Sequence, residues 1–454
     1  MGFEMDEMNR RSQERQQRQE ARRRKERANR IRILAALGVL AACGVLIAFT
    51  SLGGMPGKPK DTAPSQPGEQ LSTAGTTAPV ETEPPVTETE PQMESKPGQQ
   101  GNFQPTTVIH FAAAGDLNIT DKVVASGGVN YDYTAAFMDV LPLLSEADLT
   151  AMNLEGNVCG APYDGNSAPQ QLLEALKAAG VDMLQLANSK SINRGVAGLN
   201  ATVRSVRAAE MAAVGAVAEG EEPGAYVIRY VNGIKVAVVA FTKGMDGMAM
   251  PVGSEKLVNL LYTDYASTYK KMDTKGITEL LRKVQEEEPD ITIALLHWGS
   301  EYSDVHSATQ ETIQKLMLKE GVDAIIGTHP HFVQEMVFDR EKGTFVAYSL
   351  GDFFGDAVRS GTAYSVVLDL EITKDNTTGV TKVTNFSYTP IYTVEDDTGS
   401  LRVLRLKEAV DAYNAAQVGH VTEATYKDML YGLDRLEKRI HPKQEGTDST
   451  DPTE

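Results

Sequence analysis

Cysteine is nearly absent from this sequence: Cys43 and Cys159 are its two cysteines in 454 residues. Cys43 lies in an apolar run close to the N-terminus, whereas Cys159 lies in the region that we expect to fold, so no disulfide between them is expected. Structural zinc sites are commonly built from several thiolates, so this scarcity argues against such a site. A lone cysteine without an activating partner predicts a buried, inert thiol rather than a nucleophile.

Positive charge is also in deficit. The chain has 44 lysine and arginine residues against 62 aspartate and glutamate residues, which gives a net charge of −18. Part of the excess comes from a polar stretch near the N-terminus and part from the acidic tail after His441. Because binding to a nucleic-acid backbone requires clustered lysine and arginine, we expect no nucleic-acid partner.

One long apolar run is present near the N-terminus. Residues 1–32 are basic, and Ile33–Thr50 has no charged residue. About twenty apolar residues in a helix span a bilayer, and basic flanks stay in the cytoplasm. We predict a cytoplasmic segment over 1–32 and a single-pass membrane anchor over 33–52, with the following domain extracellular. The alternative is a lipoprotein signal cleaved before Cys43; the apolar residues after Cys43 favour the anchor.

Large apolar side chains are almost absent from residues 53–105, which are rich in Pro, Thr, Ser, Gly, Gln and Glu. Such a composition cannot bury enough surface to offset the entropy lost on folding, so we predict a disordered stalk. Residues 442–454 are acidic and predict a disordered tail. Between these segments we expect a folded domain over 106–400 and a helical extension over 401–441, whose apolar periodicity is typical of packed helices.

The fold class expected for residues 106–400 is α/β. Apolar runs typical of buried strands alternate with helical patterns such as Gln170–Ala179 and Thr309–Lys319, which indicates parallel pairing. Asn232-Gly233 joins two strand-like runs and predicts a hairpin, and Tyr364–Thr373 with Val380–Tyr392 predicts a second antiparallel pair. Together these pairs indicate two mixed sheets packed against each other, with helices outside them.

Side chains of metal-ligand type follow the apolar runs. In an open α/β sheet the carboxyl ends of the strands form the binding crevice, so such side chains can converge from distant parts of the sequence. The set contains carboxylates, an amide and imidazoles but no thiolate, which suits Mn, Fe or Zn in a hydrolytic centre. We predict a site for two divalent metal ions with the ligands Asp116, Glu155, Asn188, His297, His329 and His331.

The pair His329-Pro330-His331 is the strongest single motif. Two histidines in a loop are often plain surface residues, but here the preceding run is apolar and His297 ends a similar run, which favours metal binding. Asp116 and Glu155 alone would be consistent with turn or helix caps. The prediction therefore depends on the whole set rather than on any one residue.

In their order and spacing, these motifs resemble the CapA family of capsule synthesis proteins, whose members are linked to poly-γ-glutamate production. The resemblance runs from about Val108 to Phe354. It rests on Gly115-Asp116, Asn153-Leu154-Glu155, Ala187-Asn188 to Gly195, His297-Trp298-Gly299-Ser300-Glu301-Tyr302, Gly327-Thr328-His329-Pro330-His331 and Tyr348-Ser349-Leu350-Gly351-Asp352-Phe353. That family in turn resembles the calcineurin-like metallophosphoesterases, which implies a four-layer α-β-β-α sandwich with a dinuclear metal centre.

The sequence departs from the family pattern at three positions. Lys190 stands where a histidine would act as general acid, and Asn193 where an aspartate would orient it. Lysine side chains, with an ordinary pKa of about 10.4, are poorly matched to proton transfer at neutral pH. Asp352 replaces a usual asparagine and either adds charge near the metals or caps a turn. The candidate catalytic residues are Lys190, Asn193 and Glu301, with Lys190 or Glu301 handling protons.

Two functions fit this pattern. The first is a membrane-anchored extracellular hydrolase or transferase that uses metal ions to act on poly-γ-glutamate or another capsule or cell-envelope substrate, by phosphoester or γ-glutamyl amide chemistry. The second is a catalytically weakened protein of the same fold that binds a capsular or wall polymer. The six ligand types favour the first, and the histidine replaced by Lys190 favours the second. The expected partners are the membrane and an anionic polymer or a phosphorylated envelope substrate.

Overall fold

The computed structural model describes residues 104–415 and 421–441, which belong to one compact unit of the chain, Lys96–Glu454. The expected cytoplasmic segment, the membrane anchor, the stalk up to residue 103 and the tail 442–454 lie outside the described residues. Within 104–415 and 421–441, no helix is long and apolar enough to cross a membrane.

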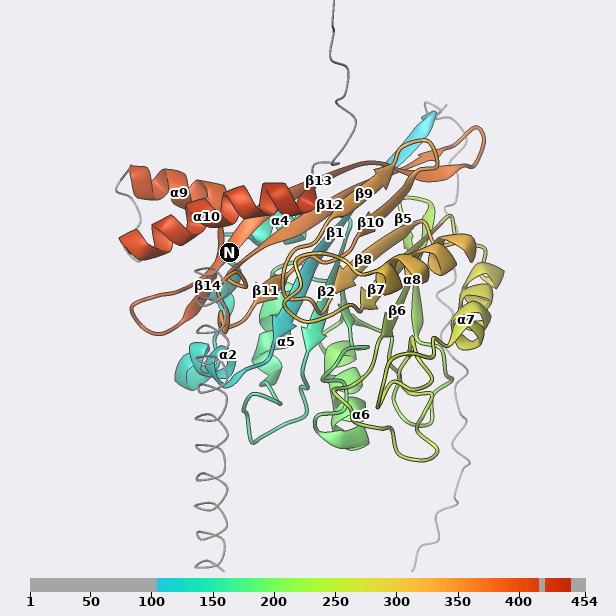
Figure 1. Cartoon of the computed structure of the whole chain (residues 1–454), viewed down its shortest axis with the longest axis horizontal. Coiled ribbons are helices and arrows are strands. Elements are labelled where there is room, and N and C mark those ends of the chain that lie inside the picture. Colours follow the sequence, from blue (N-terminus) through green and yellow to red (C-terminus); the bar gives the residue numbers. More distant parts are fainter. Residues whose placement is uncertain (1–103, 416–420, 442–454) are drawn as a thin grey trace, which may run out of the picture. The chain divides into compact units, whose positions relative to one another are not determined.

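Two mixed β-sheets form the centre of the described region (Figure 1). The first sheet has the strand order β14-β13-β12-β1-β2-β3-β4, with β11 paired to β1. The strands β11, β1, β2, β3 and β4 pair in parallel, and β12, β13 and β14 pair in the antiparallel sense. Their bounds are β1 (Thr106–Asn118), β2 (Leu149–Glu155), β3 (Met183–Gln185), β4 (Ala212–Val214), β11 (Asp352–Phe354), β12 (Tyr364–Asp375), β13 (Thr381–Glu395) and β14 (Leu401–Arg405).

The second sheet has the order β5-β6-β7-β8-β10-β9. Its central strands pair in parallel, and its two edge strands, β5 and β9, pair in the antiparallel sense. The bounds are β5 (Tyr226–Val231), β6 (Ile234–Thr242), β7 (Ile291–His297), β8 (Ala324–Thr328), β9 (Met336–Asp339) and β10 (Thr344–Ala347). The prediction of an α/β domain with two mixed sheets is confirmed.

Side chains of the second sheet alternate between two hydrophobic cores. Along β6, Val236, Val238 and Ala240 belong to the large core to which both sheets contribute, whereas Val239 and Phe241 belong to a second core. That second core includes residues of the helices α7 (Thr274–Glu286) and α8 (Ala308–Lys319). Because successive side chains of a strand point to opposite faces, one face of this sheet packs on the shared core and the other packs on α7 and α8.

Helices also pack on the first sheet (Figure 1). The C-terminal helices contact β12, β13 and β14, and helices earlier in the chain contact strands such as β1, β4 and β14. The bounds are α2 (Asp121–Ser126), the 3-10 helix η1 (Gly128–Asn130), α3 (Thr134–Phe137), α4 (Leu141–Ser145), α5 (Gln170–Ala178), α6 (Gly195–Ala208), α9 (Leu406–Asn414) and α10 (Glu423–Ile440).

Both antiparallel pairs expected from the sequence are present. The turn between β5 and β6 has Asn232 at φ 50° and Gly233 at φ 80°, the left-handed backbone that a tight two-residue hairpin requires and that Asn and Gly tolerate best. Strands β12 and β13 form the second pair. Residues 401–405, which the sequence places in the helical extension, form β14 and pair with β13.

Glycine at position 115 allows two strands to meet at the end of β1. The backbone N–H of Asp116 donates to the carbonyl oxygen of Gly351 at 2.9 Å, and a Cβ atom built on Gly115 would lie 1.8 Å from that same oxygen. Any other residue at position 115 would therefore force the two chain segments apart. This close approach sets Asp116 opposite Asp352 in the parallel pairing of β1 with β11.

Candidate metal centre

The candidate ligands lie at strand ends of both sheets. Asp116 lies near the end of β1, Glu155 is the last residue of β2 and His297 is the last residue of β7, while Asn188 and His329 follow β3 and β8. These five residues and His331 are buried, with exposed fractions from 0% to 8%. Parallel strands bring their carboxyl ends to one edge, which explains how residues so distant in sequence gather there.

Two groups of possible metal-ligand atoms share the carboxylate of Asp116. One group is Asp116, Glu155 and His297, and the other is Asp116, His331 and Asp352. Within each group the ligand atoms lie within 4.8 Å of one another. A carboxylate has two oxygens, so the arrangement offers two adjacent cation positions joined by one side chain.

Hydrogen bonds from two other elements fix the Asp116 carboxylate. The side-chain amide of Asn153, on β2, donates to Oδ1 at 2.6 Å, and the backbone N–H of His329 donates to Oδ2 at 3.0 Å. His329 has φ 93°, a strained value for a residue other than glycine. Such strain persists where the surrounding structure imposes it, and sites that bind ligands are common places for it.

Several buried polar atoms near this centre have no hydrogen-bond partner among the described residues: Glu155 Oε2, His297 Nε2, His329 Nδ1 and Asn118 Oδ1. Leaving a buried polar atom unpaired costs about 1–3 kcal/mol. Carboxylate oxygens, amide oxygens and neutral imidazole nitrogens can each offer a lone pair to a cation. The residues present therefore fit divalent ions such as Mn, Fe or Zn.

Burial controls the protonation of these groups. It raises the pKa of Asp116 to about 8, and the nearby charge of Glu155 adds to this effect. Burial also holds the pKa values of His297 and His329 well below their ordinary range, so both rings are neutral at pH 7, as metal binding requires. Although burial opposes ionisation of Glu155, the charge of Lys190 and other neighbours holds the pKa of Glu155 below its usual value.

His331 differs from the other two histidines. Burial disfavours its charged form, but the carboxylates of Asp352, Glu155 and Asp116 together outweigh burial and raise the pKa of His331 to about 10. The ring of Tyr302 stacks on His331 with centroids 5.2 Å apart, and the guanidinium of Arg359 lies 3.8 Å from the centroid of Tyr302. An aromatic ring thus lies against His331, and an arginine lies against that ring.

Asn188 is engaged in local hydrogen bonds. Its side-chain N–H groups donate to Asn153 Oδ1 at 3.1 Å and to the carbonyl oxygen of Leu154 at 2.7 Å, and its Oδ1 accepts from the backbone N–H of Lys190 at 3.0 Å. These bonds link Asn188 to Asn153 and to β2, and its role as a metal ligand stays a prediction. The side chain of His329 lies outside both ligand groups.

The three candidate catalytic residues lie in different surroundings. Lys190 is half-buried and its charge acts on Glu155. The side-chain amide of Asn193 donates to Asn166 Oδ1 at 3.0 Å, in an exposed position. Glu301 is exposed and lines a small cavity next to His329. Asn193 is thus bonded to a residue outside the ligand groups.

Lys243 and Asp352 are two residues of this site that the ligand prediction omits. Lys243 directly follows β6, and its ammonium donates to the carbonyl oxygen of Gly299 at 2.8 Å and lies 3.2 Å from His329 Nε2. Burial lowers the pKa of Lys243 from its usual value. The strand-end rule would have found Lys243, because it ends the apolar run of β6. Asp352 lies in a quoted motif, but β11 is a strand of only three residues and carries no periodic signal.

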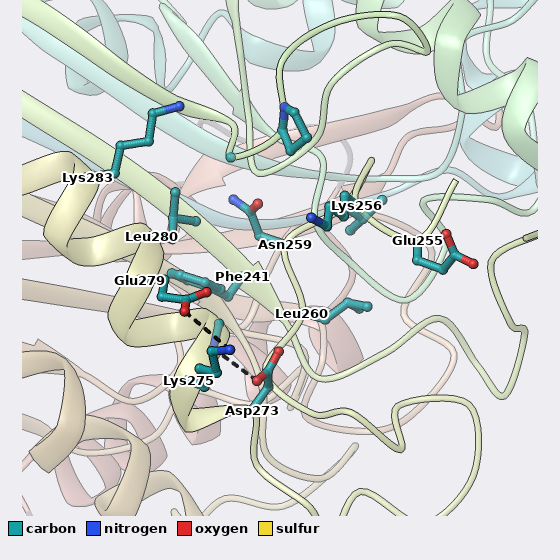
Figure 2. A pocket seen from close by; sticks show the side chains of 14 residues that line it. Phe241, Glu255, Lys256, Asn259, Leu260, Asp273, Lys275, Glu279, Leu280 and Lys283 are labelled. Carbon is teal, nitrogen blue, oxygen red and sulfur yellow. Dashed lines mark hydrogen bonds and ion pairs between the residues drawn. The ribbon is translucent and has the colours of Figure 1, made fainter. Parts of the chain in front are cut away.

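The structure contains a further cavity of about 580 Å³ away from these residues, between the start of α7 and the segment 255–260 (Figure 2). Asp273 caps α7 by accepting from the backbone N–H of Gly276 at 3.0 Å, and Lys275 pairs with Glu279 at 3.6 Å. None of the residues lining this cavity belongs to the ligand groups. This cavity is therefore separate from the candidate metal centre.

These features define an α/β protein with a buried carboxylate and imidazole centre suited to divalent cations. The chain belongs to the family described as bacterial capsule synthesis protein PGA_cap, which matches residues 110–357. The resemblance to CapA proteins inferred from the motifs is confirmed.

Two curated proteins are similar to this chain in sequence. The chain is 28% identical to the capsule biosynthesis protein CapA of Bacillus anthracis over 58% of its own length and 62% of that protein. It is 25% identical to the PGA biosynthesis protein CapA of Bacillus subtilis over 63% of its length and 71% of that protein. A crystal structure of the calcineurin-like phosphoesterase YfkN from Bacillus subtilis aligns with a TM-score of 0.39 and 18% identity, over 73% of this chain and 99% of that one.

Proposed function

We propose that this protein is a metal-dependent hydrolase or transferase that acts on poly-γ-glutamate or another capsule or cell-envelope substrate. One observation carries the proposal: Asp116 joins two buried ligand groups, and Glu155 and His297 in the first group each have an atom without a hydrogen-bond partner. The relatives named for capsule biosynthesis support the choice of substrate class.

The residues of this site would divide the work of such a reaction. Asp116, Glu155 and His297 would hold one ion, and His331 and Asp352 would join Asp116 around a second. Bound ions of this kind polarise a carbonyl or phosphoryl oxygen and lower the pKa of a bound water. Asn153 keeps the shared carboxylate in place, and Ser189, which donates to Glu155 Oε1 at 2.6 Å, does the same for Glu155.

Location outside the cell membrane is part of the proposal. It is supported by the uncharged run within 33–52, the basic residues before it and the polar composition of 53–105. An anchor with a long stalk would keep the centre near envelope polymers without fixing its orientation.

A second candidate function is binding of a capsular or wall polymer with little turnover. The hydrogen bond between Asn193 and Asn166 favours it, because a side chain held there does not orient a proton donor at position 190. The ligand groups favour catalysis, and we retain catalysis as the main proposal.

The test uses the purified full-length chain loaded with Mn, Fe or Zn. We expect metal-dependent cleavage of poly-γ-glutamate or of a generic phosphodiester such as bis-p-nitrophenyl phosphate. Asp116→Asn should abolish both metal binding and cleavage. The contrary outcome is a wild-type protein that binds metal and sediments with the polymer but cleaves neither substrate. That result would make polymer binding the proposed function in place of catalysis.

A further inference from the structure

Lys243 is held rigidly at the edge of the metal centre. Its backbone N–H donates to the carbonyl oxygen of His297 at 2.8 Å, and its ammonium donates to the carbonyl oxygen of Gly299 at 2.8 Å. The ammonium also lies 3.2 Å from His329 Nε2 and 4.9 Å from the centroid of the Tyr269 ring. A lysine on a flexible stem gains this order only through several contacts, since fixing its rotamers costs up to about 2 kcal/mol.

The same ammonium borders a cavity of about 250 Å³ that reaches the centre. The lining residues are Ser189, Lys243, Gly244, Asp246, Tyr269, Ser300, Glu301 and His329. Ser189 and His329 connect the cavity to Glu155 and Asp116, to which they are hydrogen-bonded. A ligand in this cavity would therefore lie next to the proposed ions.

The charges around the cavity are unevenly placed. Among the residues that line the cavity, Lys243 has a basic side chain, and Asp246 and Glu301 have acidic side chains. The positive charge of Lys190, which follows β3, favours the ionised forms of Asp246 and Glu155. An ammonium has three N–H donors, and the contacts of Lys243 with Gly299 and His329 leave one for a ligand.

We infer that Lys243 binds the negatively charged group of the substrate, a phosphate or a carboxylate, inside this cavity. The inference rests on the proposed function, because it takes the cavity beside the centre as the substrate's place. A charge-assisted hydrogen bond in a partly buried site is stronger than a neutral one. The acids Asp246 and Glu301 repel an anion from their part of the cavity, so the oxyanion lies at Lys243, beside His329.

The experiment measures binding of two probes to the full-length, metal-loaded protein by calorimetry. Inorganic phosphate represents a phosphorylated substrate and glutarate a carboxylate substrate. We expect Lys243→Met and Lys243→Gln to weaken the preferred probe at least tenfold with unchanged metal content, and Lys243→Arg to keep its affinity within about threefold. The matched control is Lys315→Met, which removes an exposed lysine of α8 and should change nothing.

A measurement on the unaltered protein covers the case in which the variants do not fold. Saturating probe should protect Lys243, and not Lys315, from reductive methylation as mapped by mass spectrometry. Three results would overturn the inference: wild-type affinity in both uncharged variants, no binding of either probe to the wild-type protein, or equal labelling of Lys243 with and without probe. Each of these results leaves metal content, and hence the proposed function, to be judged separately.

Discussion

The imidazole of His331 and the carboxylate of Asp352 form a buried pair, with Nδ1 2.7 Å from Oδ1. The same oxygen accepts from the side-chain amide of Asn118 at 2.9 Å. In the family pattern described above, an asparagine usually stands in place of Asp352. The added carboxylate is thus bonded to both His331 and Asn118.

Metal stoichiometry should separate the two ligand groups. Asp116→Asn removes the carboxylate that both groups share, so we expect it to lose both ions, whereas Asp352→Asn should lose one. Elemental analysis of the purified chain gives the number of ions per molecule. The matched control is Asp369→Asn, because Asp369 forms a similar pair with His110 at 3.0 Å but at the surface. Two ions retained in Asp116→Asn would contradict the assignment.

Asp352→Asn should also change the protonation of its partner. Burial lowers the pKa of His331, but the carboxylates of Asp352, Glu155 and Asp116 together raise it to about 10. Without the Asp352 carboxylate, the pKa of His331 should fall. Titration of the His331 ring signals by NMR in the metal-free protein measures this shift. An unchanged pKa would mean that Asp116 and Glu155 alone keep the ring charged.

Replacement of Lys190 by histidine should raise turnover of a generic phosphoester. A well-matched general acid contributes about 10²–10⁴-fold, and we expect a gain toward the lower end because Lys190 also helps to keep Glu155 ionised. Adding Asn193→Asp should contribute little more, since that side chain is bonded to Asn166. Rates are compared at equal metal occupancy and several pH values. High wild-type activity, or a fully loaded Lys190→His variant without any gain, would argue against this role.

Asp323 should make the domain less stable as pH rises from about 4 to 6. Burial raises its pKa from 3.8 to about 6, so the folded state binds the proton more tightly than the unfolded state does. Below about pH 4 the Asp323 carboxyl is neutral in both the folded and the unfolded protein. Its ionisation above pH 6 lowers the free energy of unfolding by up to about 3 kcal/mol. Asp323→Asn should therefore be more stable than wild type at pH 7 and lose that advantage near pH 4.

Urea unfolding at several pH values gives the free energy of unfolding for this comparison. Asp323 accepts from the backbone N–H of Thr292 at 2.8 Å, and an asparagine oxygen can accept the same bond. Asp182→Asn is the matched control, since Asp182 accepts an equivalent bond from Thr150 at 2.9 Å. A difference between Asp323→Asn and wild type that is constant from pH 4 to 7 would show that burial of this carboxylate does not affect the stability.

Protease added to intact cells should release a fragment of the size of residues 106–441. The expected cleavage lies in 53–105, where the composition predicts an extended chain open to proteases. Release before lysis supports the extracellular orientation. A domain that is protected until the cells are lysed would reverse the proposed topology.

Local signals carried most of the fold prediction. The Asn232-Gly233 turn and the alternation of apolar strands with amphipathic helices depend on neighbouring residues, so the sequence alone identifies them. The pairing of β14 with β13 depends instead on contacts made across the sheet. A five-residue strand segment that runs directly into a helix cannot be told from the start of that helix by periodicity.

The site residues could be predicted from the sequence where they lie at the ends of strands. Asp116, Glu155 and His297 end apolar runs, and the structure brings them together. The positions of Asn188 and Asn193 follow from hydrogen bonds to Leu154 and Asn166, which no spacing encodes. Tertiary contacts therefore decide the hydrogen-bond surroundings of these two residues.

The contact between Gly115 and Gly351 bears on how relatives of this protein are compared. The two chain segments that carry Asp116 and Asp352 can approach only because position 115 has no side chain, as a Cβ atom there would lie 1.8 Å from the carbonyl oxygen of Gly351. A homologue with alanine at that position could keep every ligand in its alignment and still have no working centre. Inventories of ligand residues would count such a protein as intact, although the defect lies in a residue that binds nothing.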